Sequence, residues 1–348
     1  MKAQIDDIDA RILDLIQSEF PLDPMPFDVI GRRLSIDSDD VLARIARLKS
    51  DGIIRQISAI FDSASLGYHS ALVAFRVLSE LLDRVASEVS EHDGVSHCYS
   101  RDADYNLWFT LTLAPEYNLQ SEVARLAVID GVLSHMLLPT VRVFKIGVFL
   151  KISGEGRVEG GEQTMDAEKL TAARQVTPSP GGEGRGEGAL PLNIENAEVK
   201  AAVRALQADL PLVARPFSDL ANEYGLSEDK LLNMALVFLQ NGVMRRYSAV
   251  LRHGRAGYTF NAMICWRVST DMISEVGEKI SQHSSVSHCY QRPTYPDWPY
   301  SLYTMVHARS QEELDEIISD LMLNSLNFEH LVLKTLTEYK KQRILYFQ

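Results

Sequence analysis

This 348-residue sequence has few cysteines, no apolar leader and no long apolar run. Its three cysteines include no CxxC pair, which argues against a disulfide scaffold or a zinc ribbon and fits a reducing compartment. The first ten residues contain three aspartates and no apolar region, so we expect no signal peptide. No apolar run approaches the roughly 20 residues that cross a bilayer. These absences predict a soluble cytoplasmic protein without a membrane partner.

The sequence also lacks an excess of positive charge. Lys and Arg number 35 against 47 Asp and Glu, a net charge of −12. Such a chain is a poor candidate for binding nucleic acid over a broad surface, although a local basic cleft is compatible with it. The length predicts about two to three domains. The last four residues, LYFQ at 345–348, resemble the remnant of a cleaved purification tag, and we exclude them from functional reasoning.

An internal duplication runs through the chain. DGIIRQISAIFDSASLGY at 51–68 matches NGVMRRYSAVLRHGRAGY at 241–258 with an offset of 190. Further on, VSHCYSR at 95–101 matches VSHCYQR at 286–292. Short identities that keep their order and spacing indicate two homologous halves. Between them, residues 153–193 are rich in glycine and poor in aromatic residues, which predicts a flexible linker.

Both halves show the same order of predicted elements. Three helices precede a strand at 53–61, the order of a winged helix-turn-helix, with Ser38 capping the third helix and Gly52 ending it. The elements that follow in half one are strands at 71–77, 95–100, 107–113 and 141–150 and helices at 79–89 and 117–127. Those in half two are strands at 262–268, 286–291, 301–307 and 331–339 and helices at 271–280 and 311–323.

The predicted fold class is therefore α+β, a tandem duplication in which each half is a winged helix-turn-helix followed by a ferredoxin-like βαββαβ domain. The expected domains are 1–62 and 63–152, then, after the linker at 153–193, 194–252 and 253–344. This order resembles the Lrp/AsnC-type transcription regulators. However, a DNA reader needs long polar side chains on its third helix. That helix begins with three short or acidic residues in half one. Its equivalent in half two, at 228–239, is almost wholly apolar, and we expect it to be buried. We therefore expect no nucleic-acid partner.

A narrower resemblance rests on longer strings. These are SHCYSRDADYNLWFTLTL (96–113), LLPTVRVFKIGV (137–148), MRRYSAVLRHGRAGY (244–258), NAMICWRV (261–268), CYQRP (289–293) and DWPYSLYTMVHAR (297–309). They are similar to strings of the sirohaem (siroheme) decarboxylases, a family of regulator-like subunits that are heterodimeric in some members and fused in others. The resemblance covers nearly the whole chain except the linker.

The resemblance implies removal of CO2 from the acetate side chains on carbons 12 and 18 of sirohaem, giving 12,18-didecarboxysirohaem for haem or haem d1 biosynthesis. It implies no cofactor beyond the iron of the sirohaem substrate. It also implies that the two halves pair within the chain, with further homo-oligomers left open. The alternatives are an Lrp/AsnC-type transcription regulator and a non-catalytic tetrapyrrole sensor.

The expected site residues follow from the chemistry of this substrate. Sirohaem is a flat polyanion around an iron, which suits guanidinium groups at the rim, aromatic side chains and an imidazole. Loss of CO2 leaves electron density that a positioned acid must protonate. His253 is the expected proton donor or axial contact to the iron, Arg246 is expected to hold a carboxylate, and His97 is the further catalytic candidate. The expected substrate-binding residues are Arg245, Arg252, Tyr290, Arg292, Trp298, Tyr300, His307, Arg101 and Lys145.

Simpler structural roles remain open for several of these residues. The arginines after the third helix of half two could simply be surface charges. The histidines of the two VSHCY strings could be structural residues, and the tryptophans could fill the core. Half one has Ser63 at the position equivalent to His253. We therefore expect half two to carry the main site and half one to complete it.

Overall fold

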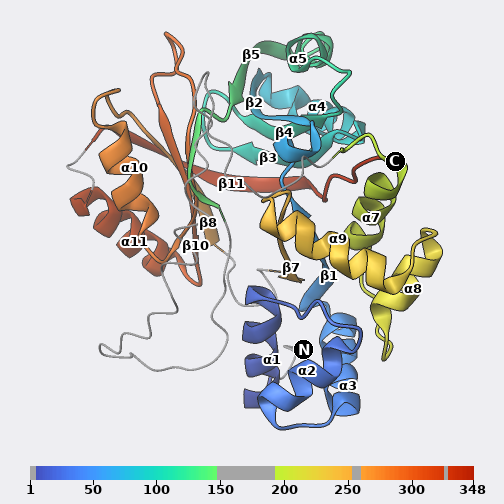
Figure 1. The fold of residues 1–348 in the computed structure, drawn as a ribbon. Helices are drawn as coiled ribbons and strands as arrows, with labels where there is room; N and C mark the ends of the chain where they lie inside the picture. Colours follow the sequence, from blue (N-terminus) through green and yellow to red (C-terminus); the bar gives the residue numbers. More distant parts are fainter. Residues whose placement is uncertain (1–4, 147–192, 253–259, 325–327) are drawn as a thin grey trace.

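The computed structural model describes residues 5–146, 193–252, 260–324 and 328–348, and it confirms an α+β fold built from two equivalent halves (Figure 1). Half one begins with α1 (Asp7–Ser18), α2 (Pro26–Leu34), α3 (Ser38–Ser50) and β1 (Ile54–Phe61). Half two repeats them as α7 (Ala197–Gln207), α8 (Pro216–Glu223), α9 (Glu228–Gln240) and β7 (Met244–Leu251). No helix in the described ranges is long and apolar enough to cross a membrane.

Local sequence explains where these helices begin and end. Asp6 and Asp9 form a reciprocal capping box at the start of α1. The expected cap at Ser38 is wrong, because Asp37 is the N-cap of α3, makes no side-chain capping bond, and Ser38 is already helical. Gly52 and its equivalent Gly242 follow α3 and α9 with φ values of 70° and 69°, in the left-handed region that favours glycine.

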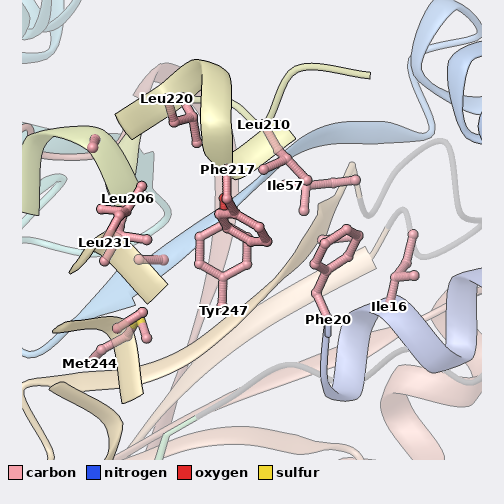
Figure 2. Packing of buried hydrophobic residues seen from close by; sticks show 14 of the residues in the cluster. Ile16, Phe20, Ile57, Leu206, Leu210, Phe217, Leu220, Leu231, Met244 and Tyr247 are labelled. Carbon is pink, nitrogen blue, oxygen red and sulfur yellow. The ribbon is translucent and has the colours of Figure 1, made fainter. Parts of the chain in front are cut away.

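The two helix-turn-helix units share one hydrophobic core. Strands β1 and β7 pair antiparallel into a two-stranded ribbon in which Ser58 lies opposite Ser248. The amide of Phe20 donates to the carbonyl oxygen of Tyr247 (3.0 Å), and the equivalent amide of Leu210 donates to that of Ile57 (2.9 Å). Figure 2 shows residues of both halves packing around the Tyr247 ring. The ribbon therefore lies on a pseudo-two-fold axis.

The other strands form one nine-stranded sheet, in the order β5-β2-β4-β3-β11-β8-β10-β9-β6. The half-one elements are β2 (His69–Val77), α4 (Leu82–Glu91), β3 (Val95–Arg101), β4 (Leu107–Leu113), α5 (Leu119–Leu126), β5 (Val132–Pro139) and β6 (Arg142–Ile146). The half-two elements are β8 (Phe260–Trp266), α10 (Ile273–Ser281), β9 (Val286–Gln291), β10 (Leu302–Ala308), α11 (Gln311–Asn324) and β11 (His330–Lys341). Helices α4 and α5 pack on the half-one strands, and α10 and α11 on those of half two (Figure 1).

Each half contributes a strand to the sheet of the other half. The first part of β11 pairs with β8, and its second part, Thr335–Lys341, pairs with β3 of half one. In the same way β5 pairs with β2 of half one, whereas β6 pairs with β9 of half two. The prediction of a single closing strand at 141–150 is therefore wrong for half one. The missed strand β5 lies at a sheet edge, and exposed Leu133 breaks the alternation expected of a half-buried strand.

The C-terminal residues excluded above have a packing role. Tyr346 is 9% exposed, and its ring contacts that of Tyr68 edge-on with centroids 4.9 Å apart. Its hydroxyl lies 2.7 Å from Ser63 Oγ, and the side-chain amide of Gln207 bonds to its backbone N–H and carbonyl. The tail therefore joins half-one and half-two residues on the helix-turn-helix core.

Candidate substrate site

The two ends of the ribbon have equivalent backbones and different charges. At one end, the amide of Arg252 donates to the carbonyl of Ile53 (2.9 Å); at the other, the amide of Asp62 donates to that of Val243 (2.8 Å). We call these the first end and the second end. At the second end, Arg245 forms an ion pair with Asp62. At the first end, Arg55 is equivalent to Arg245, and Arg252 is equivalent to Asp62. A cation therefore stands at the first end where the second end has a carboxylate.

Other basic residues lie next to Arg55. Its Nη2 donates to the carbonyl oxygen of Lys341 (3.0 Å), and Lys341 is the register partner of His97 in the β11–β3 pair. Arg343 reaches the middle of the ribbon, where its Nη1 donates to Ser58 Oγ and to the carbonyl oxygen of Ala59 (3.2 Å). These contacts place strands β1, β3 and β11 around one basic region.

Arg246 belongs to the same region. Ile57, Ala59 and Tyr247 face the hydrophobic core, so strand alternation puts Arg246 and Ser58 on the opposite face of the ribbon. Burial, followed by the charges of Arg55 and Arg246, lowers the pKa of Arg343 to about 10. We call the set Arg55, His97, Arg246, Arg252, Lys341 and Arg343 the ribbon cluster; Arg252 is included because it is equivalent to Asp62, the partner of Arg245.

The ribbon cluster has little negative charge to balance it. Among the described residues, its four arginines take part in no ion pair, and Lys341 meets only Glu338, at 3.7 Å. Burial, then the charges of Lys341 and Arg55, lowers the pKa of His97 to about 4, so this imidazole is neutral at neutral pH. Arginines without carboxylate partners, next to a neutral imidazole, favour the binding of a carboxylate-rich ligand.

The structure thus brings together three of the predicted site residues, His97, Arg246 and Arg252. His253 lies outside the described residues, although its chain neighbour Arg252 belongs to the cluster. Sequence reasoning missed Arg55, Lys341 and Arg343. Arg55 carried a usable signal, because the offset of 190 aligns it with Arg245.

Arg101 and Arg292 are placed between the halves instead. Arg101 is 5% exposed and donates through Nη1 to the carbonyl of Leu333 (2.9 Å), whereas Arg292 is 9% exposed and donates to that of Leu138. Leu138 and Leu333 occupy equivalent positions, so the two contacts are related by the pseudo-two-fold. Burial lowers the pKa of both guanidinium groups. Each arginine therefore links one half to a strand of the other.

Two other predicted residues have packing contacts. Trp298 is 5% exposed, and its ring lies 5.5 Å from that of Trp108 in the core between the halves. Tyr300 packs edge-on against Trp298 at 5.0 Å. Both aromatic rings therefore belong to the core between the halves.

The remaining predicted residues lie on half two or at the second end. Lys145 donates to the carbonyl of His283, just after α10 (2.8 Å). His307 Nε2 lies 2.9 Å from Ser287 Oγ. Burial raises the pKa of Tyr290 to about 12, opposed by Arg292 and Arg245, which places Tyr290 near the second end. The described residues contain no group of three His, Cys, Asp or Glu side chains that could hold a metal ion.

Comparison with known families identifies the class of protein. Residues 65–145 and 255–340 match the AsnC-like ligand binding domain. Residues 9–55 and 200–245 match the siroheme decarboxylase NirDL-like HTH domain. The chain is thus a tandem of two regulator-like halves, each with a helix-turn-helix and a ligand-binding domain.

Individual relatives identify the family. A siroheme decarboxylase of Hydrogenobacter thermophilus is 39% identical over 338 residues, covering 97% of this chain and 94% of the relative. The crystal structure of the siroheme decarboxylase NirDL aligns with a TM-score of 0.71 at 34% identity, covering 99% of this chain and 95% of that one. A co-complex of NirDL with an iron-uroporphyrin III analogue aligns with a TM-score of 0.70 at 33% identity and the same coverage. The chain belongs to the sirohaem decarboxylase family, whose members are carboxy-lyases.

Some relatives divide the two halves between separate subunits. The beta subunit of siroheme decarboxylase from Desulfovibrio desulfuricans is 38% identical over 151 residues, covering 43% of this chain and 95% of the subunit. The alpha subunit from the same organism is 37% identical over 158 residues, covering 44% of this chain and 88% of the subunit. The present chain is the fused form.

Proposed function

We propose that this chain removes CO2 from the acetate side chains on carbons 12 and 18 of sirohaem, and that the reaction takes place at the ribbon cluster. Membership of the sirohaem decarboxylase family supports the reaction. The observation that carries the location is the group of arginines without ion-pair partners on one face of the ribbon. Sirohaem has carboxylates around its whole rim, which such guanidinium groups bind by charge-assisted hydrogen bonds.

In the proposed reaction, Arg246 and its neighbours anchor non-reacting carboxylates and so orient one acetate. The bond between the methylene carbon and the carboxylate breaks, CO2 leaves, and the electron pair passes into the macrocycle. One proton then reaches the methylene carbon and makes it a methyl group. The chemistry needs no oxidant, and the only metal it involves is the iron of the substrate.

We assign proton delivery to His253, with His97 as the second candidate. His253 directly follows Arg252 of the cluster in the sequence. His97 is neutral in the free protein because burial, and then the nearby charges of Lys341 and Arg55, lower its pKa. A bound polycarboxylate offsets those cations and raises the pKa of His97, so substrate binding itself favours a protonated imidazole.

We also propose that the chain is cytoplasmic and does not read DNA. Its three cysteines, Cys98, Cys265 and Cys289, are free thiols, as expected in a reducing compartment. On α3, Arg44 is held by Asp6 at 2.7 Å and Asp9 at 2.9 Å, which leaves it poorly available to phosphates.

Helix α9 offers no better surface for phosphates. It buries Leu231, Leu232, Ala235 and Phe238, whereas Leu236 and Val237 are exposed, so the expectation that this helix is wholly buried is wrong. Leu236 and Val237 are apolar and form no hydrogen bonds with phosphates or base edges, and Lys230 of the same helix forms an ion pair with Glu198.

The test is anaerobic incubation with sirohaem followed by mass spectrometry. The wild type should yield products lighter by one and then two CO2, whereas a tetrapyrrole sensor would bind sirohaem without releasing CO2. Arg246→Ala should weaken sirohaem binding by about 1–3 kcal/mol. His253→Ala should bind sirohaem but lose about 10²–10⁴ in turnover. Arg84→Ala, which removes an exposed arginine on α4, is the control and should match the wild type in both assays. Wild-type turnover and affinity in both Arg246→Ala and His253→Ala would refute the location.

A further inference from the structure

The two ends of the ribbon are equivalent in backbone geometry well beyond the ribbon itself. His97 of β3 pairs with Lys341 of β11 near the first end. By the same register, His288 of β9 pairs with Ile146 of β6 in the other half of the sheet. A duplicated chain could therefore have kept two equivalent sites, one at each end.

The side chains at the second end preserve less of the positive charge. Arg55, Arg252 and Lys341 of the first end correspond to Arg245, Asp62 and Ile146. In the other direction, Gln56 corresponds to Arg246, which pairs with Ile60 on the second-end side of the ribbon. Burial opposes ionisation of Asp62, but hydrogen bonds from Arg245 and Ser65 outweigh it and hold the pKa of this carboxyl below its usual value. Asp62 is thus an anion that neutralises Arg245. A carboxylate of a ligand approaching Arg245 would have to displace Asp62.

The C-terminal tail also occupies the second end. Ser63, which corresponds to His253, lies 2.7 Å from the hydroxyl of Tyr346. Tyr346 packs edge-on against Phe61 at 6.3 Å and against Tyr68 at 4.9 Å. An ion pair and a buried tyrosine therefore fill this end.

We propose that each chain has one decarboxylation site, at the first end of the ribbon, because the Asp62–Arg245 ion pair and Tyr346 close the second end to polycarboxylates. This inference rests on the proposed function and specifies where both of its reactions occur. In this proposal the acetates on carbons 12 and 18 react one after the other with the same proton donor of that site.

The shape of the substrate gives this inference a kinetic consequence. Carbons 12 and 18 lie on adjacent pyrrole rings in mirror-image order, with two propionates between the two acetates. Turning the macrocycle in its own plane does not bring one acetate to the place of the other; only turning the ring over does. For both acetates to meet the same proton donor, the product of the first step must leave the site, turn over and bind again. Each step breaks one carbon–carbon bond, releases one CO2 and consumes one proton.

Binding stoichiometry tests the number of sites. Iron uroporphyrin III, titrated by visible absorbance into the full chain at concentrations well above its dissociation constant, should saturate at one equivalent per chain. Arg252→Asp puts an acid beside Arg55, just as Asp62 lies beside Arg245. This variant should bind iron uroporphyrin III more weakly and lower sirohaem kcat/KM, each by about 10- to 100-fold. Arg252→Ala should change both in the same direction, and since Arg252 is exposed, the folding of both variants should be preserved.

The matched variant at the other end is Asp62→Asn, which should leave sirohaem kcat/KM within about two-fold of the wild type; thermal unfolding verifies that each variant is folded. Two equivalents bound to the wild-type chain would overturn the inference. It would also be overturned if folded Asp62→Asn lost as much turnover as Arg252→Asp.

A trapping experiment tests release of the intermediate. Excess iron uroporphyrin III added after the first CO2 is lost should leave singly decarboxylated sirohaem in solution and stop the second loss. Conversion to the doubly decarboxylated product despite the trap would contradict the use of one proton donor for both acetates. These outcomes are separate from failure of the proposed function, in which the wild type releases no CO2 from sirohaem at all.

Discussion

Replacing Arg101 by methionine should destabilise the fold and leave substrate affinity unchanged. The Arg101 guanidinium donates to the carbonyl oxygen of Leu333 at 2.9 Å and to Thr335 Oγ1 at 3.1 Å, and both acceptors lie on the strand that half two contributes. Hydrogen bonds to a charged group contribute about 1.5–3 kcal/mol each. Arg101 has no carboxylate partner among the described residues. Replacing this buried cation therefore also removes its desolvation cost, which offsets part of the lost hydrogen-bond energy. We expect a net loss of about 2 kcal/mol in the free energy of unfolding.

Urea denaturation followed by tryptophan fluorescence measures this loss, because Trp108 and Trp298 lie in the core between the halves. Arg292→Met should behave alike, since it removes the equivalent contact to Leu138. Arg84→Met is the control: its ion pair with Asp130 is exposed on both sides, so its loss should be below about 0.5 kcal/mol. If Arg101→Met kept wild-type stability and bound iron uroporphyrin III tenfold more weakly, Arg101 would belong to the substrate site and our assignment would be wrong.

Three further predictions concern other parts of the molecule. The pKa of His97 is lower in the folded than in the unfolded chain, so the free energy of unfolding should fall by about 1–2 kcal/mol as the pH drops from about 6.5 to 4. In urea titrations at several pH values, His97→Asn should make this fall smaller. Tyr346→Ala should cost about 3–5 kcal/mol in thermal or urea unfolding, whereas Leu345→Ala, at a 54% exposed position, should cost little. The protein should give no sequence-specific footprint on promoter DNA at nanomolar concentration and physiological salt; any such footprint would refute the DNA prediction.

Sequence reasoning reached the duplicated fold because the signals that encode it are local. Gly52 and Gly242 recur at a fixed offset, and both adopt the left-handed conformation that their turns require. The strands at 107–113 and 286–291 have the predicted bounds, because short apolar runs between turns define them. The exchange of β6 and β11 between the halves could not be predicted, since strand pairing between distant segments leaves no local pattern.

The substrate site was only partly predictable for the same reason. Arg246 and Arg252 belong to one basic string, whereas Lys341 and Arg343 reach the site only because β11 crosses from half two to half one. Arg101 was expected to bind substrate because a charged residue on an aromatic strand suggests ligand binding. Its burial and its bond across the halves exist only in the assembled fold.

The position of the bound ring, measured in a crystal structure of this chain with iron uroporphyrin III, tests the proposed site most directly. We expect the macrocycle at the first end of the ribbon, with its carboxylates within hydrogen-bond distance of Arg55 or Arg252. A ring bound at the second end, against Arg245 and Tyr290 with Asp62 displaced, would contradict it.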